Sequence, residues 1–171
     1  IRKNKQTHYE QAGIFKGFVK IDDAKIDLDM KALRDHSFGP RDWDYMQRHV
    51  WLIGALDDGS YFNYSLVRYP SVKNITAGFV IKKEKVFSIV DGIKLDELYD
   101  GRTIPQDFNF WFVLEDGRRF QVKCSFEHSF SWNLNDVYQI TEGIASFELN
   151  DVKAKGIAEF GNNISRRQKH G

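Results

Sequence analysis

The sequence predicts an all-β protein that folds as a single antiparallel up-and-down β-barrel of about eight to ten strands. Three observations predict this fold: apolar and polar residues alternate along most segments, Asp-Gly dipeptides separate them, and no stretch has the 3.6-residue period of a long amphipathic helix. Asp-Gly favours hairpins because glycine tolerates the positive φ of a tight turn. A meander of hairpins has two open edges, and closure into a barrel removes both. A β-sandwich is the alternative architecture.

Alternation defines the strands of the N-terminal part. Ile26, Leu28 and Met30 alternate with polar residues, as expected for a half-buried strand. Met46-Gln47-Arg48-His49-Val50-Trp51-Leu52 alternates again, which makes His49 a strand histidine with satisfied hydrogen bonds rather than a metal ligand. The run Asp57-Asp58-Gly59-Ser60 ends this strand as a turn. The expected strands are 8–20, 24–34, 46–57 and 60–69.

Turn signals divide the remainder of the chain in the same way. They lie at Asp91-Gly92, Asp100-Gly101-Arg102 and Glu115-Asp116-Gly117-Arg118. The segment from Leu95 to Tyr99 is predicted to form one helical turn. The expected strands are 75–83, 86–91, 106–114, 118–127, 137–149 and 153–161.

The strand 106–114 carries large side chains on both faces. Phe108, Phe110 and Phe112 share one face, and Trp111 and Val113 share the other. Two apolar faces indicate that both sides are covered, or that the inner side lines an apolar cavity for a small ligand.

Composition limits the function classes. The 171 residues are expected to form one domain, 1–171, and 25 Lys and Arg balance 24 Asp and Glu, which argues against a nucleic-acid binder. No apolar run is long enough for a transmembrane helix. The single Cys124 excludes an internal disulfide and a cysteine-based zinc site, and it is expected in the core. Three glycosylation sequons, at Asn63, Asn74 and Asn163, weakly favour a secreted protein.

The segment 34–43 is the chemically densest part of the sequence. It combines Asp35, His36, Arg41 and Asp42 with two aromatic residues around a Gly-Pro pair. A histidine beside a carboxylate can act as a general acid or base, and Arg41 can orient the carboxylates. The alternative is a structural ion-pair cluster at a barrel corner, with Trp43 stacked on an arginine. The scattered histidines predict no metal site.

Asp35-His36-Ser37-Phe38-Gly39-Pro40-Arg41-Asp42-Trp43 resembles the Asp-His-aromatic-Gly-x-Arg-x-Trp corner of the lipocalin-like (calycin) barrels related to carotenoid 1,2-hydratase. The resemblance covers most of the chain, from about Gly13 to Glu159, and only the corner is specific. It implies an antiparallel β-barrel with an apolar cavity. The hydratase site it implies joins His36 and Phe38 to a Tyr-x-Asp pair, but the matching Asn63-Tyr64-Ser65 has the tyrosine out of register and lacks the acid.

The leading functional hypothesis is therefore a non-catalytic carrier of a small hydrophobic ligand, such as a carotenoid or another isoprenoid, with no required cofactor. The expected ligand-binding residues are His36, Phe38, Arg41, Trp43, Trp51, Tyr64, Phe108, Phe110, Phe112 and Trp132. One alternative is a terpenoid hydratase, isomerase or cyclase that uses His36 with Asp35 or Asp42. Another is a structural barrel filled by its own side chains, whose exposed aromatic residues make a homo- or hetero-oligomer interface.

Overall fold

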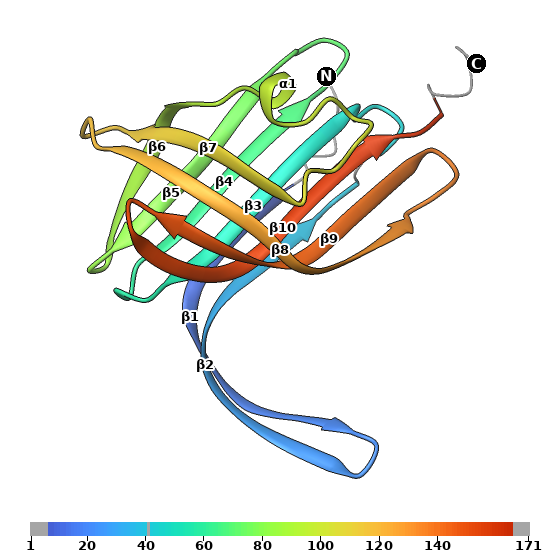
Figure 1. The fold of residues 1–171 in the computed structure, drawn as a ribbon. Helices are drawn as coiled ribbons and strands as arrows, with labels where there is room; N and C mark the ends of the chain where they lie inside the picture. The colour runs from blue at the N-terminus through green and yellow to red at the C-terminus, as the bar shows by residue number, and fades with distance from the viewer. Residues whose placement is uncertain (1–6, 41, 166–171) are drawn as a thin grey trace. The chain divides into compact units, whose positions relative to one another are not determined.

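The computed structural model describes residues 7–40 and 42–165 (Figure 1). Its internal contacts divide the chain into two compact units, Ile1–Arg41 and Asp42–Gly171. The first unit is a two-stranded hairpin, and the second is a closed β-barrel. The two strands that the sequence analysis placed at the start of the barrel thus form a sheet of their own.

The second unit confirms the predicted architecture. Eight strands close in the order β10-β3-β4-β5-β6-β7-β8-β9, and every neighbouring pair is antiparallel. Consecutive strands are neighbours throughout, as in an up-and-down meander. The elements are β1 (Thr7–Ile21), β2 (Ala24–Phe38), β3 (Arg48–Leu56), β4 (Tyr61–Arg68), β5 (Ile75–Lys82), β6 (Lys85–Gly92), α1 (Leu95–Leu98), β7 (Asp107–Leu114), β8 (Arg119–Asn133), β9 (Tyr138–Leu149) and β10 (Val152–Asn163).

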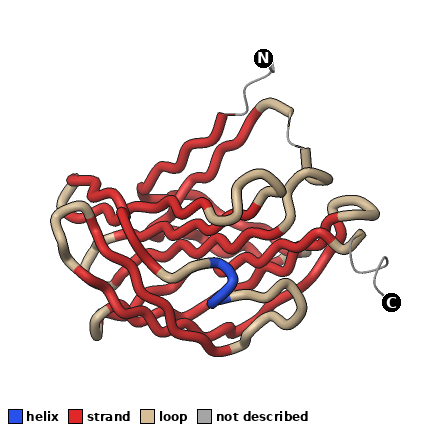
Figure 2. The backbone as a smooth tube through the Cα atoms, turned by 90° about the horizontal axis from the view of Figure 1, so that it is seen from above, coloured by secondary structure: helices blue, strands red, loops and turns tan. Residues whose placement is uncertain are grey.

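The helical turn expected at 95–99 is present as α1, drawn in blue among the strands in Figure 2. Leu95 is fully buried in the main core, and Tyr99 is also buried there. Arg48 on β3 and Arg68 on β4 both bond the Asp96 carboxylate. These contacts fasten α1 to the barrel strands.

The barrel interior is packed with aromatic and aliphatic side chains. Phe62, Tyr64 and Leu66 on β4 and Phe112 and Leu114 on β7 have no exposed surface. Close packing of this kind needs small residues opposite large rings. Gly54 provides one such position, because a Cβ there would lie 2.5 Å from the ring of Phe62, its partner on β4.

Strand β8 contains a bulge that the sequence did not predict. Its register with β9 shifts between Phe126, which pairs with Ala145, and His128, which pairs with Ile144. The extra residue reverses which face the following side chains occupy. The strand therefore continues to Asn133, six residues beyond its expected end.

Candidate functional site

His36 lies in β2, within a strand that extends through the predicted corner. Its partner across the hairpin is Tyr9, whose hydroxyl lies 2.8 Å from His36 Nδ1. The guanidinium of Arg34 lies 3.2 Å from the same nitrogen, and the Phe38 ring packs against the imidazole at an interplanar angle of 58°, with ring centroids 5.5 Å apart. The hairpin thus brings His36 and Phe38 together on one face, with Tyr9 and Arg34 as partners that sequence spacing did not reveal.

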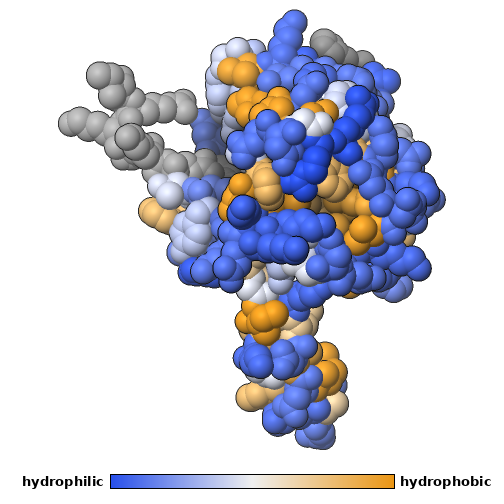
Figure 3. Space-filling view, turned by 90° about the vertical axis from the view of Figure 1, so that its left-hand side faces the viewer, coloured by the Kyte–Doolittle hydropathy of each residue, from blue (hydrophilic) through white to orange (hydrophobic). Residues whose placement is uncertain are grey.

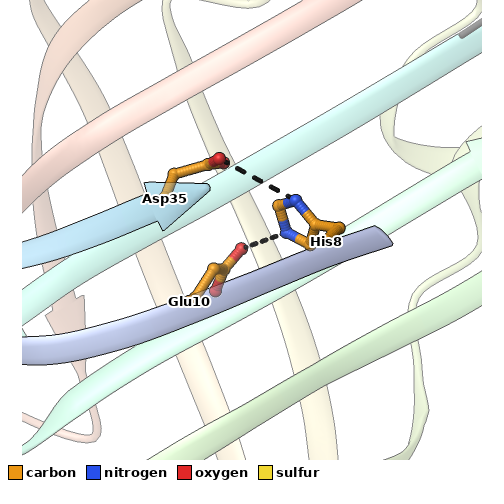
Figure 4. Close-up of side chains that lie close together, drawn as sticks. All are labelled: His8, Glu10 and Asp35. Atoms are coloured by element: carbon orange, nitrogen blue, oxygen red, sulfur yellow. Dashed lines mark hydrogen bonds and ion pairs between the residues drawn. The ribbon is translucent and has the colours of Figure 1, made fainter. Parts of the chain in front are cut away.

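Asp35 lies on the opposite face of the same strand. Successive residues of a strand point to opposite sides, so Asp35 cannot orient the imidazole of His36. Asp35 instead lies 3.8 Å from His8 Nδ1, and Glu10 lies 3.1 Å from His8 Nε2 (Figure 4). One ligand atom from each of these three residues lies within 4.8 Å of the others. We had predicted no metal site, and this triad is a group that could hold a cation.

The predicted corner contains three further residues, Arg41, Asp42 and Trp43. Arg41 lies outside the described residues. Asp42 belongs to the second unit, where its carboxylate accepts a hydrogen bond from the Tyr45 amide at 3.1 Å. Trp43 packs on Tyr138, with ring centroids 5.1 Å apart.

The most extensive buried polar network of the barrel involves His49. Its Nε2 donates to Glu159 at 2.6 Å, and its Nδ1 lies 2.7 Å from the hydroxyl of Tyr138, which then donates to it. The imidazole is 7% exposed and stacks parallel to the Tyr138 ring. Space for it comes from Gly161, where a Cβ would lie 2.1 Å from the imidazole. His49 is thus a strand histidine with both nitrogens bonded, as the sequence predicted.

A second carboxylate lies next to this network. Glu142 on β9 is the cross-strand partner of Glu159 on β10, and Trp51 on β3 is the partner of Glu159 on its other side. Burial raises the pKa of Glu142, and the charge of Glu159 raises it further. No local sequence pattern indicates this pair, because the two residues meet only through the register of the barrel strands.

The predicted cavity-lining aromatics fill the barrel. Tyr64 stacks on Phe110 and Phe112, with ring centroids 5.5 and 5.7 Å apart. Its hydroxyl donates to the Ile93 carbonyl at 2.8 Å. Burial raises the pKa of the Tyr64 phenol, and nearby carboxylates add to the effect, so the phenol keeps its proton. Phe108 also points inward, but it is only partly buried.

The two remaining predicted tryptophans do not face the interior. Val50 and Leu52, on either side of Trp51, are fully buried inside the barrel, so Trp51 lies on the outer face of β3. Trp132 follows the β8 bulge and pairs with Ile140. It packs in a small cluster around Met46 that is separate from the main core.

A hollow of about 700 Å³ lies against β7, β8, β9 and β10. It is bordered by Phe108 and Phe147 and by charged side chains, among them Lys123 and Glu148, which form an ion pair at 2.6 Å. Cys124 also borders it, and burial raises the pKa of this thiol, which keeps it protonated. The hollow thus combines apolar and charged surface, and Phe108, one of the predicted ligand-binding residues, borders it.

The asparagine residues of the three sequons differ in their exposure to solvent. Asn63 is 3% exposed and Asn163 is 5% exposed, so neither can carry a glycan in the folded barrel. Asn74 lies exposed in the loop before β5. In the described residues no helix has both the length and the apolar character needed to cross a membrane.

The comparisons with known proteins agree with the fold. No curated protein matches the chain. The crystal structure of a Nitrosomonas europaea protein provisionally named AttH matches with a TM-score of 0.59 at 13% identity, over 91% of this chain and 51% of that one. At this identity the likeness concerns the fold alone, and the chain spans about half the length of that protein. A family model covers residues 2–164, so the chain belongs to the family described as domain of unknown function DUF7064.

Proposed function

We propose that this chain is a non-catalytic interaction module, in which the barrel is a self-packed scaffold and the hairpin is a docking element. The observation that carries the proposal is a long two-stranded hairpin with exposed apolar side chains. A two-stranded sheet is at best marginally stable in water, and here its strands are 15 residues each with large apolar side chains exposed. Such a surface is typical of an element that is covered by a partner.

The packing of the barrel supports this role over a carrier role. The rings expected to surround a ligand, Tyr64, Phe110 and Phe112, contact one another and are at most 2% exposed. Catalysis has little support, because His36 and Asp35 point to opposite faces of β2. The relationship to carotenoid 1,2-hydratase stays a prediction from resemblance.

A polyene titration tests the self-packed scaffold. Purified protein is mixed with all-trans-retinol, and tryptophan quenching and co-elution are followed. We expect no saturable binding, because the interior rings occupy the space that a polyene would need. Stoichiometric binding at the barrel would overturn the proposal.

A second candidate function is binding of an apolar ligand, such as a carotenoid or another isoprenoid, at the rim of the barrel. It is favoured by Phe108 and Phe126, which extend the interior aromatic cluster through contacts with Phe160 but remain partly exposed. If retinol binds, Phe108→Ala should weaken binding. Phe130→Ala, which removes an exposed phenylalanine after the bulge, should not.

A further inference from the structure

One face of the hairpin is apolar from its middle to its tip. Residues paired across an antiparallel hairpin share a face, so the register identifies this surface directly. The pairs are Gly13–Ala32, Phe15–Met30, Gly17–Leu28, Val19–Ile26 and Ile21–Ala24, and none has an ionisable side chain. Their large side chains are exposed: Phe15 by 47%, Val19 by 42%, Ile21 by 60%, Ile26 by 50% and Met30 by 52%. Figure 3 shows hydrophobic side chains on the surface of the hairpin.

The other face of the hairpin carries the charges. Lys16 pairs with Asp29 at 3.2 Å, and Lys25 pairs with Asp27 at 2.8 Å. The Lys25 ammonium also lies 4.8 Å from the ring centre of Phe18, which belongs to this charged face. Ile14 and Phe18, each 59% exposed, also lie on this face, so the two faces of the hairpin differ in charge, and the uncharged face is the one suited to a partner.

The charge distribution argues against a lipid surface as that partner. The turn at the tip consists of Asp22 and Asp23, and the described hairpin contains five basic and six acidic residues. An acidic tip opposes insertion, and a hairpin without excess positive charge gains nothing from anionic lipids. A protein surface is the better match.

The apolar face has a shape that complements itself. Gly13 and Ala32 form a row of small residues, which we call the trough, and a Cβ added at Gly13 would have no atom within 4 Å. Phe15 and Met30 form the next row, which we call the ridge. A twofold axis between these rows, across the strands, places the ridge of each copy over the trough of the other, and Gly17 and Leu28 of each copy over Gln11 and Arg34 of the other. Two sheets stacked in this way interdigitate as in a β-sandwich.

The area is sufficient for a dimer. The five large side chains are each about half exposed, which gives roughly 500 Å² per copy if each offers about 200 Å² in total. Two copies would then bury on the order of 1,000 Å², the lower limit for a specific interface. A dimer of this size is expected to dissociate in the micromolar range.

We infer that two copies of this chain dimerise through the apolar faces of their hairpins, with the ridge of one copy in the trough of the other. This inference rests on the proposed docking role of the hairpin and names its partner. It assigns Gly13 a purpose, since a side chain there would fill the trough. The symmetry limits the assembly to two copies, because the apolar face of each copy is covered by the same face of the other.

Sedimentation equilibrium of the full chain over a wide concentration range tests the inference. Wild-type protein should show a monomer–dimer equilibrium. Gly13→Leu fills the trough from a position where an added Cβ has no atom within 4 Å, and it should weaken the dimer by roughly 10- to 100-fold. Ala12→Leu adds bulk to the adjacent residue on the charged face and should leave the dimer unchanged.

A second pair of variants distinguishes loss of the dimer interface from misfolding. Phe15→Gln removes half of the ridge, whereas Phe18→Gln removes an exposed phenylalanine from the charged face. Only the first should weaken the dimer, while both should keep the thermal melting curve of the barrel. A monomeric wild type at all concentrations, a trimer or larger assembly, or a dimer unaffected by Gly13→Leu and Phe15→Gln would each overturn the inference. Retinol binding would overturn the self-packed scaffold without affecting this result.

Discussion

Replacing Phe110 by alanine measures how completely the barrel is filled. The side chain is 2% exposed, and its ring lies among three others, with centroids 5.5 Å from Tyr64, 6.1 Å from Phe108 and 6.4 Å from Phe112. Phe110→Ala removes apolar burial and leaves a cavity that these rings cannot close. Fully buried Phe→Ala substitutions cost about 3–5 kcal/mol, and we expect a loss in that range.

Urea unfolding followed by tryptophan fluorescence provides the free energy of unfolding, and Phe130→Ala is the matched control. Phe130 is 64% exposed and stacks only on Trp132, with ring centroids 5.0 Å apart. Its removal should cost about 1 kcal/mol or less. If Phe110→Ala costs no more than Phe130→Ala, Phe110 already borders a void, and the self-packed barrel is refuted. If the expected loss is found, added benzene should recover part of it by occupying the new cavity.

Two further predictions concern buried polar groups. Tyr64→Phe removes the donor to the Ile93 carbonyl and should lower the free energy of unfolding by about 1–3 kcal/mol; a loss near zero would show that water replaces the hydroxyl. The folded-state pKa of Glu142 is raised above its ordinary value of 4.5, so the folded protein binds this proton more tightly than the unfolded chain, and stability should fall as pH rises through that folded-state pKa. Glu142→Gln should remove this fall and stabilise the protein at neutral pH, as read from melting temperatures between pH 4 and pH 8, and an unchanged pH profile would contradict the assignment.

The strands were predictable because their determinants are local. Asp-Gly turns and period-two alternation located all ten strands to within two residues, except that β2 ends four and β8 six residues later than expected, and the helical turn at Leu95 was also found. Which strands pair is a different question. The alternation at Ile26 and Met30 is the same as that of a barrel strand, so it could not reveal that β1 and β2 pair only with each other. The β8 bulge near Phe126 likewise has no glycine to mark it, although it decides which way Trp132 points.

The candidate site was less predictable, because its partners are distant in the sequence. His49 bonds Tyr138 and Glu159, which lie 89 and 110 positions away, so only the closed register brings them together. The placement of His36 and Asp35 on opposite faces was predictable, in contrast to the His49 network, because it follows from the two-residue period of a strand. The strand that we expected over 24–34 continues to Phe38, and extending its two-residue period places the two residues on opposite faces.

The position of His36 connects the corner motif to the proposed dimer. His36 and Tyr9 form one cross-strand pair on the same face as the ridge and the trough. The inferred twofold axis maps this pair onto Val19 and Ile26 of the second copy, because both pairs lie equally far from the axis. The imidazole Nδ1 is bonded to the phenol, and the two residues present flat rings to two β-branched side chains. In this arrangement His36, the residue on which the catalytic hypothesis depended, instead contributes to a buried interface.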